Sequence, residues 1–179
     1  MRRSARLTEL NAPVEITEYD PAWPERFASE RALLERIVAP WLDGGVHHVG
    51  STAVPGLAAK PIVDIMVGVR DLEEARAAIP LLKRESYCYF PYRDYFHWFC
   101  KPSEAHREFH MYLIEPAHPE WRARLAFRDR LRTHPETAAE YEALKRKLAE
   151  EYRDDREAYT DAKAEFVEQV VARALRVEN

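Results

Sequence analysis

Cysteine is scarce in this sequence, which holds two, Cys88 and Cys100, among 179 residues. The two lack the short spacing of a metal-binding pair, and so few thiols in a composition of this kind are typical of reduced, buried side chains. We therefore expect no metal centre built on cysteine and two reduced thiols in the interior.

The sequence also lacks an excess of basic residues. Lysine and arginine number 27 against 31 aspartates and glutamates, which gives a net charge of −4. Proteins that bind nucleic acid without regard to sequence neutralise phosphates with a basic surface. We therefore expect no generic nucleic-acid partner, although a local basic patch is compatible with the composition.

Long apolar runs are absent as well. No stretch is long enough to span a bilayer as a helix. The basic residues 1–6 are not followed by the apolar segment of a signal peptide. We therefore expect a cytoplasmic protein without a membrane partner.

Enough apolar material is present for one compact domain. Hydrophobic residues make up 46% and charged residues 32%, a balance typical of soluble globular proteins. Residues 1–13 show no hydrophobic period, so we expect a flexible N-terminal arm there. No repeat or linker divides the remainder, and we expect a single domain over residues 14–177.

Hydrophobic periodicity predicts an α+β fold, in which a mixed β-sheet is backed by helices and followed by a helical C-terminal segment. Asp20-Pro21 is typical of a helix start, and Gly44-Gly45 is expected to stop that helix. Residues 14–16 fit either a short strand or an extended lead-in. The predicted helices cover residues 20–41, 71–83, 119–132, 135–152 and 155–177. The predicted strands cover residues 46–50, 61–69, 87–90, 95–100 and 109–115.

A small polar turn precedes the most strongly predicted strand. Gly50 permits close approach of the backbone to a ligand, and Ser51 adds a hydroxyl donor. Lys60, at the end of the same loop, is able to reach an anion near the turn. Each also has an ordinary explanation, since Gly-Ser pairs occur in many turns and loop lysines are usually solvated.

Asp64 lies inside the apolar strand that follows. An ionised carboxylate in such a segment is costly unless it meets a metal, a cation or several donors. A structural aspartate bonded to backbone amides or paired with a basic residue is the alternative. Because the Gly50-Ser51 turn and Asp64 occur together, we favour a functional role in phosphate or nucleotide chemistry.

Histidines supply further candidates. His110 and Tyr112 share one face of the strand predicted at residues 109–115. His110 fits an acid, a base or a metal ligand, and it equally fits a sheet histidine satisfied by a neighbour. His47 and His48 point to opposite faces of their strand, so at most one of them serves the same site.

Charged and aromatic residues elsewhere are weaker candidates. Lys145 and Lys163 are expected at the surface unless their helices fold over the site, and Glu115 fits either a late ligand or a surface charge. The candidate phosphate contacts in loops are Arg93, Lys101 and Arg107. The aromatic residues expected in the core rather than in a base-stacking platform are Tyr95, Phe96, Trp98 and Phe99.

Several motifs carry a resemblance to a known family. They are Tyr19-Asp20-Pro21-Ala22-Trp23, the run from His48 to Asp64, Phe127-Arg128-Asp129 with Leu131-Arg132, His134-Pro135-Glu136, Tyr141 with Leu144-Lys145, and Tyr159-Thr160 with Ala162-Lys163. On these matches residues 14–171 resemble the GrpB family of uncharacterised proteins. The resemblance covers most of the chain, and its long motif is specific.

The resemblance implies a nucleotidyltransferase-like fold. In that superfamily a Gly-Ser turn touches nucleotide phosphates, and a pair of carboxylates on the next strand holds divalent cations. Gly50, Ser51 and Asp64 match this pattern, whereas Met66 stands at the second acidic position. A thioether is a poor ligand for Mg²⁺. Tyr112 stands where relatives tend to carry the second histidine of His-Leu-His.

The resemblance also implies roles for individual residues. Phosphate or nucleotide contacts would come from Gly50, Ser51, Thr52 and Lys60. Asp64 would bind Mg²⁺, and Asp64 and His110 would be the catalytic residues. Asp64 alone supplies fewer carboxylate ligands than the standard two-metal mechanism requires.

Three functions are compatible with these residues. The first is a protein that binds a nucleotide or related phosphorylated small molecule and, if catalytic, transfers a nucleotidyl group. The second is a non-catalytic ligand-binding or interaction module of the same fold, with a degenerate metal site. The third is a hydrolase or other transferase in which His110 assists a transition metal. Oxygen ligands around Asp64 would favour Mg²⁺-dependent transfer. A cluster of histidines with Asp64 would favour a transition metal. A pocket without any ligand cluster would favour binding without catalysis.

Overall fold

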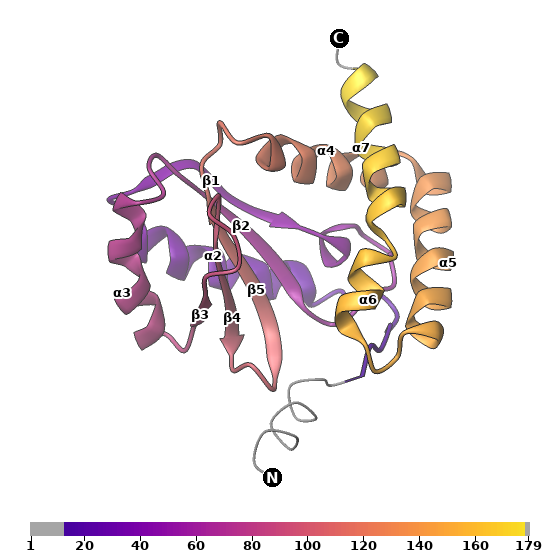
Figure 1. The fold of residues 1–179 in the computed structure, drawn as a ribbon, viewed down its shortest axis with the longest axis horizontal. Coiled ribbons are helices and arrows are strands. Elements are labelled where there is room, and N and C mark those ends of the chain that lie inside the picture. The colour runs from indigo at the N-terminus through magenta and orange to yellow at the C-terminus, as the bar shows by residue number, and fades with distance from the viewer. Residues whose placement is uncertain (1–12, 178–179) are drawn as a thin grey trace.

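The computed structural model describes residues 13–177, in which five strands form one mixed sheet (Figure 1). The strands are β1 (Leu42–Val49), β2 (Val63–Val69), β3 (Cys88–Phe90), β4 (His97–Pro102) and β5 (Arg107–Ile114). Their order across the sheet is β1-β2-β5-β4-β3. β2 and β5 run parallel, and every other neighbouring pair is antiparallel.

Helices flank this sheet and make up the C-terminal third of the chain. They are α2 (Trp23–Ile37), η1 (Ser51–Ala53), η2 (Glu74–Ala78), α3 (Ile79–Arg84), α4 (Pro119–Thr133), α5 (Pro135–Glu151), α6 (Arg156–Asp161) and α7 (Ala164–Val177). The predicted α+β fold, with its helical C-terminal segment, is confirmed. Over residues 13–177, every helix is too short or too polar to cross a membrane.

The first helix ends earlier than predicted, and the Gly44-Gly45 pair does not stop it. α2 ends at Ile37, three residues before the proline at position 40, which disfavours helical backbone in the residue that precedes it. Gly44 and Gly45 lie inside β1 with φ of +77° and +87°. They occupy the irregular register between Leu42 and Val46, so they bend a strand.

Two other predicted helices are each divided in the structure. The segment predicted at residues 71–83 is a 3₁₀ turn, η2, followed by α3, in whose first turn Pro80 lies. The segment predicted at residues 155–177 breaks between α6 and α7 without a glycine or proline to mark the break. Most of the predicted N-terminal arm, residues 1–12, lies outside the described residues.

The sheet has one face covered by helices along its length. Alternation along β2 turns Val63, Ile65 and Val67 to this face, where they pack against α2 and the η2–α3 segment. In Figure 1, α2 crosses behind the sheet. The opposite face receives Asp64 and Met66, and Met66 packs there with Trp121 of α4. The functional candidates on β2 therefore lie on the second face.

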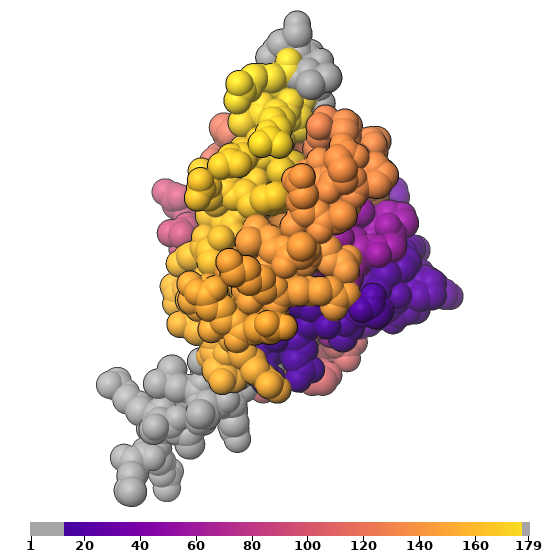
Figure 2. Space-filling view, turned by 90° about the vertical axis from the view of Figure 1, so that its right-hand side faces the viewer, coloured from indigo at the N-terminus to yellow at the C-terminus, as the bar shows by residue number. Residues whose placement is uncertain are grey.

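The C-terminal helices pack onto the loop between β1 and β2. Val54 and Leu57 of this loop form a buried cluster with Phe127 of α4, Tyr141 of α5 and Val170 of α7. Figure 2 shows α5, α6 and α7, orange to yellow, along this side of the molecule. This packing brings the helical segment over the second face of the sheet, beside Asp64.

Candidate functional site

The turn after β1 lies against Asp64. Val49 pairs with Asp64 in the β1–β2 register, and Gly50 follows with φ of +71°. A Cβ atom added to Gly50 would lie 2.5 Å from Oδ2 of Asp64. A side chain at this position would therefore meet both an unfavourable backbone conformation and the carboxylate. Glycine is the residue that lets the turn and Asp64 share this space.

Asp64 and His110 form a pair across two parallel strands. They are directly opposite in the β2–β5 register, and Nδ1 of His110 lies 3.2 Å from Oδ1 of Asp64. Burial lowers the pKa of His110. Burial alone would raise the pKa of Asp64, but the hydrogen bond from His110 and the charge of Lys60 hold it below its ordinary value. At neutral pH an ionised carboxylate therefore accepts the Nδ1–H of a neutral imidazole.

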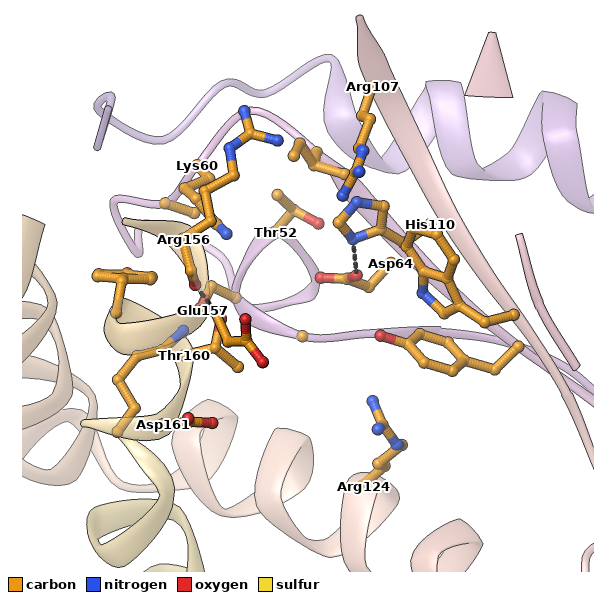
Figure 3. Close-up of a pocket in the computed structure, with 18 of the residues that line it drawn as sticks. Thr52, Lys60, Asp64, Arg107, His110, Arg124, Arg156, Glu157, Thr160 and Asp161 are labelled. Atoms are coloured by element: carbon orange, nitrogen blue, oxygen red, sulfur yellow. Dashed lines mark hydrogen bonds and ion pairs between the residues drawn. The ribbon is translucent and has the colours of Figure 1, made fainter. Parts of the chain in front are cut away.

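The other ring nitrogen of His110 has no hydrogen-bond partner among residues 13–177, although it is buried. An unpaired buried acceptor is uncommon and calls for an explanation. Arg107 lies beside the imidazole on the side away from Asp64 (Figure 3), and its charge lowers the pKa of His110 further. The imidazole is thus held by Asp64 at one nitrogen and left with a free lone pair at the other.

This pair lies in a pocket of about 780 Å³ (Figure 3). One wall is the sheet face with Asp64 and His110, and α6 forms another with Glu157 and Asp161. Among the described residues, seven basic side chains line the pocket against three carboxylates. The basic ones are Lys60, Arg93, Arg107, Arg124, Lys145, Arg156 and Lys163. A chain of net charge −4 thus has a cationic pocket, which favours an anionic ligand.

The structure brings the predicted site residues around this one pocket. Its lining includes Gly50, Ser51, Thr52, Lys60, Asp64 and His110, together with Arg93 and Arg107. Oγ1 of Thr52 lies 2.9 Å from Nε2 of His48, so this hydroxyl already has a partner inside the protein. Burial lowers the pKa of His48 to about 4, and its ring stacks on Phe27. His48 is therefore a neutral core histidine beside the site.

Three other candidates lie elsewhere. His47 donates from Nε2 to the carbonyl oxygen of Gly44, 2.8 Å away, and is absent from the pocket lining. Lys101 forms a 2.7 Å ion pair with Glu30, outside the pocket, so it is no phosphate contact there. Glu115 accepts a hydrogen bond from the Leu72 amide instead of joining Asp64. No cluster of histidines therefore forms around Asp64 within the described part of the chain.

Two lysines expected at the surface unless their helices fold over the site, Lys145 of α5 and Lys163 between α6 and α7, line the pocket. Lys145 is buried and donates from Nζ to the carbonyl oxygen of Ala58, and the ammonium of Lys163 lies 4.1 Å from the ring centre of Tyr159. Burial, together with the charge of Lys60, lowers the pKa of each to about 7. Three lysines that repel one another therefore share one cavity.

We expect the ligand-free protein to become more stable as the pH rises above about 7. Lys145 and Lys163 titrate near 7 when folded, against an ordinary value of 10.5 in the unfolded chain. Between these values the unfolded chain binds more protons, so the free energy of unfolding rises with pH. Melting temperatures from pH 6 to 9 check this. Lys163→Met should flatten the rise, whereas Lys147→Met, at an exposed position, should not; a flat wild-type profile would contradict it.

The donor set does not fit the implied Mg²⁺ site. Within residues 13–177 no three histidine, cysteine, aspartate or glutamate side chains gather as a metal site requires. Mg²⁺ prefers several oxygen ligands, but Asp64 has His110, Lys60 and Arg124 as its charged or polar neighbours. Met66, at the second acidic position, is fully buried with aromatic side chains. Asp64 is thus surrounded by cationic groups and donors.

Some residues of the pocket could not be predicted from the sequence. Arg124 of α4 lies over the ring of Tyr112, with its guanidinium carbon 4.3 Å from the ring centre. Arg156 begins α6 and lines the pocket beside Lys60 in Figure 3. Neither belongs to a motif with a recognised chemistry, and each reaches the pocket only through the packing of its helix. Tyr92 carries no signal in the sequence either, since it is a single tyrosine in a loop.

A family model and several known proteins match most of this chain. The GrpB family model, described as GrpB protein, matches residues 13–173. A UPF0157 protein of Pseudomonas aeruginosa is 38% identical over 90% of this chain and 68% of its own length. A UPF0157 protein of Bacillus subtilis is 33% identical, and this chain spans 48% of it.

Two proteins that carry the GrpB name are also similar. The glutamate-rich protein GrpB of Alkalihalophilus pseudofirmus is 30% identical over 87% of this chain and 92% of its own length. The crystal structure of the conserved protein GrpB from Enterococcus faecalis matches with a TM-score of 0.85 and 32% identity. That match covers 92% of this chain and 99% of the other. The chain belongs to the GrpB family.

Proposed function

We propose that the pocket binds a nucleotide or a related phosphorylated small molecule. The observation that carries the proposal is the charge of the pocket lining. Around the Gly50-Ser51 turn, seven basic side chains line the pocket against only three carboxylates. Charge-assisted hydrogen bonds from lysine and arginine to phosphate are among the strongest polar contacts. A volume of about 780 Å³ also falls within the range of small-molecule sites.

The arrangement of the lysines favours a polyanion over a ligand with one charge. Lys60 lowers the pKa of both Lys145 and Lys163, so the three ammonium groups repel one another in the ligand-free pocket. A ligand with several negative charges would relieve this repulsion and hold the lysines protonated. Diphosphates and triphosphates have that charge, whereas a single carboxylate does not.

Calorimetric titration with tripolyphosphate tests the binding proposal. Lys60→Ala should weaken binding by about 10- to 150-fold, because it removes one charged donor worth about 1.5–3 kcal/mol. Lys147→Ala is the matched control, since it makes the same change in net charge at an exposed position outside the pocket. Equal affinity of both variants for tripolyphosphate would contradict the proposal, as would a wild-type protein that fails to bind it.

A second candidate function, transfer at phosphorus, is supported by the free nitrogen of His110. Its lone pair could accept the proton of an attacking hydroxyl or water, while Asp64 holds the opposite nitrogen. The attacking oxygen would form a bond to phosphorus, and the bond from phosphorus to the leaving phosphate oxygen would break. Arg107, which adjoins the imidazole, would hold a phosphate next to this base.

A further inference from the structure

One part of the pocket lining is aromatic rather than charged. Tyr92, Tyr95, Phe96, Trp98 and Tyr112 all line it. Most of these rings belong to the sheet or its core, but Tyr92 lies in the loop after β3 and is 57% exposed. Among the described residues, the only other large hydrophobic side chain classed as exposed is Leu81, at 36%. Tyr92 therefore presents exposed ring surface in the wall of the pocket.

Two neighbouring rings hold Tyr92 in place. Phe90 stacks on it with ring centres 5.7 Å apart and 13° between the planes, and Trp98 meets it at 5.2 Å and 45°. The amide of Tyr92 also donates to the carbonyl oxygen of Phe90 at 3.1 Å. Tyr92 remains 57% exposed despite these two contacts and lines the pocket, so part of its ring surface is open to a ligand. The ring is therefore a supported flat surface.

This aromatic surface is continuous with the cationic part of the pocket. Trp98, which contacts Tyr92, lies 5.1 Å from the His110 ring, centre to centre. The guanidinium of Arg107 lies 5.3 Å from the Trp98 ring. A ligand whose phosphate binds Arg107 could therefore place an attached ring system against Tyr92.

We propose that Tyr92 stacks on the heterocyclic base of the ligand, so that the pocket selects a nucleotide over other phosphorylated small molecules. The inference rests on the proposed function, because the cationic residues must hold the phosphates. Every base has a π face, and stacking of one base on an aromatic side chain strengthens binding by about 5- to 150-fold. A ring held in advance by Phe90 loses little freedom on binding.

Titrations of the full chain with ATP and with tripolyphosphate separate the contribution of the base to affinity from that of the phosphates. The wild-type protein should bind ATP about 5- to 150-fold more tightly than tripolyphosphate. Tyr92→Ala should remove most of that advantage and leave tripolyphosphate affinity unchanged, while Tyr92→Phe should keep it. Leu81→Ala is the matched control, because it removes the other exposed hydrophobic side chain, which lies on α3 outside the pocket.

The outcomes distinguish failure of this inference from failure of the proposed function. Binding of tripolyphosphate without any gain for ATP would overturn the stacking role and leave the phosphate site in place. An ATP advantage that survives in Tyr92→Ala would overturn it equally. A wild-type protein that binds neither probe would overturn both. Melting temperatures of the Tyr92 variants near that of the wild type would show that any loss arises in the pocket.

Discussion

Gly50→Ala should abolish tripolyphosphate binding and lower the free energy of unfolding by about 2–5 kcal/mol. About 1–2 kcal/mol of this comes from placing a side chain at φ of +71° and ψ of −172°, a conformation that only glycine adopts readily. A further 1–3 kcal/mol, roughly, comes from overpacking, since the new Cβ would lie 2.5 Å from Oδ2 of Asp64. The carboxylate has to move, and its hydrogen bond to His110 moves with it. Denaturant unfolding and calorimetry of the same variant check both effects.

Gly56→Ala is the matched control for this variant. Gly56 has φ of +80°, close to the +71° of Gly50, but nothing lies within 4 Å of a Cβ atom added there. The Gly56→Ala variant should therefore be destabilised only by the cost of a side chain at positive φ. It should still bind tripolyphosphate. If the two variants were equally stable and equally able to bind, contact with Asp64 would not be the reason for glycine at position 50.

The core of the site could be predicted because its signals are local. The combination of a Gly-Ser turn with a carboxylate in the apolar run that follows can be seen in the sequence itself. The pairing of Asp64 with His110 is not local. β3 and β4 lie between β2 and β5 along the chain, whereas β2 and β5 are neighbours in the sheet. Periodicity assigns each residue to a face. Periodicity does not say which strands are neighbours, so the pair is established only by the register between β2 and β5.

The cationic wall could not be predicted, because it depends on tertiary packing. Lys145 and Lys163 have the spacing of ordinary helical lysines. They face inward because Val54 and Leu57 anchor the C-terminal helices on the loop before β2. The break between α6 and α7 has no glycine or proline, and it leaves Lys163 over Tyr159. Composition alone, with its net charge of −4, indicated no basic surface.

The absence of a second carboxylate changes which chemistry the site supports. Met66 is buried among aromatic side chains, and cations surround Asp64. The basic side chains can offset ligand charge without a metal held by the protein, and Asp64 is free to orient His110. The pair then has the arrangement of an oriented base, in which a carboxylate fixes the tautomer and the opposite nitrogen accepts a proton.

His110→Asn should lower turnover of a nucleoside triphosphate by about 100- to 10,000-fold, the usual contribution of a general base. The asparagine amide can still donate to Asp64, but the free ring nitrogen is lost. Tripolyphosphate affinity should stay within a few-fold of wild type, because His110 is neutral and supplies no charge. Turnover is followed by phosphorus NMR of ATP. Attack at the α-phosphorus yields AMP and pyrophosphate, and attack at the γ-phosphorus yields ADP and phosphate.

The pH profile and a control variant decide whether His110 acts as a base. Because burial lowers the pKa of His110 below 6.5, the rate should fall only as the pH drops below that value. His47→Asn changes a strand histidine outside the pocket and should keep full turnover. Parallel assays with MgCl₂ and with EDTA report whether the ligand brings a metal of its own. A wild-type protein that binds tripolyphosphate but converts no nucleoside triphosphate in either buffer would contradict catalysis and leave the pocket as a binding site.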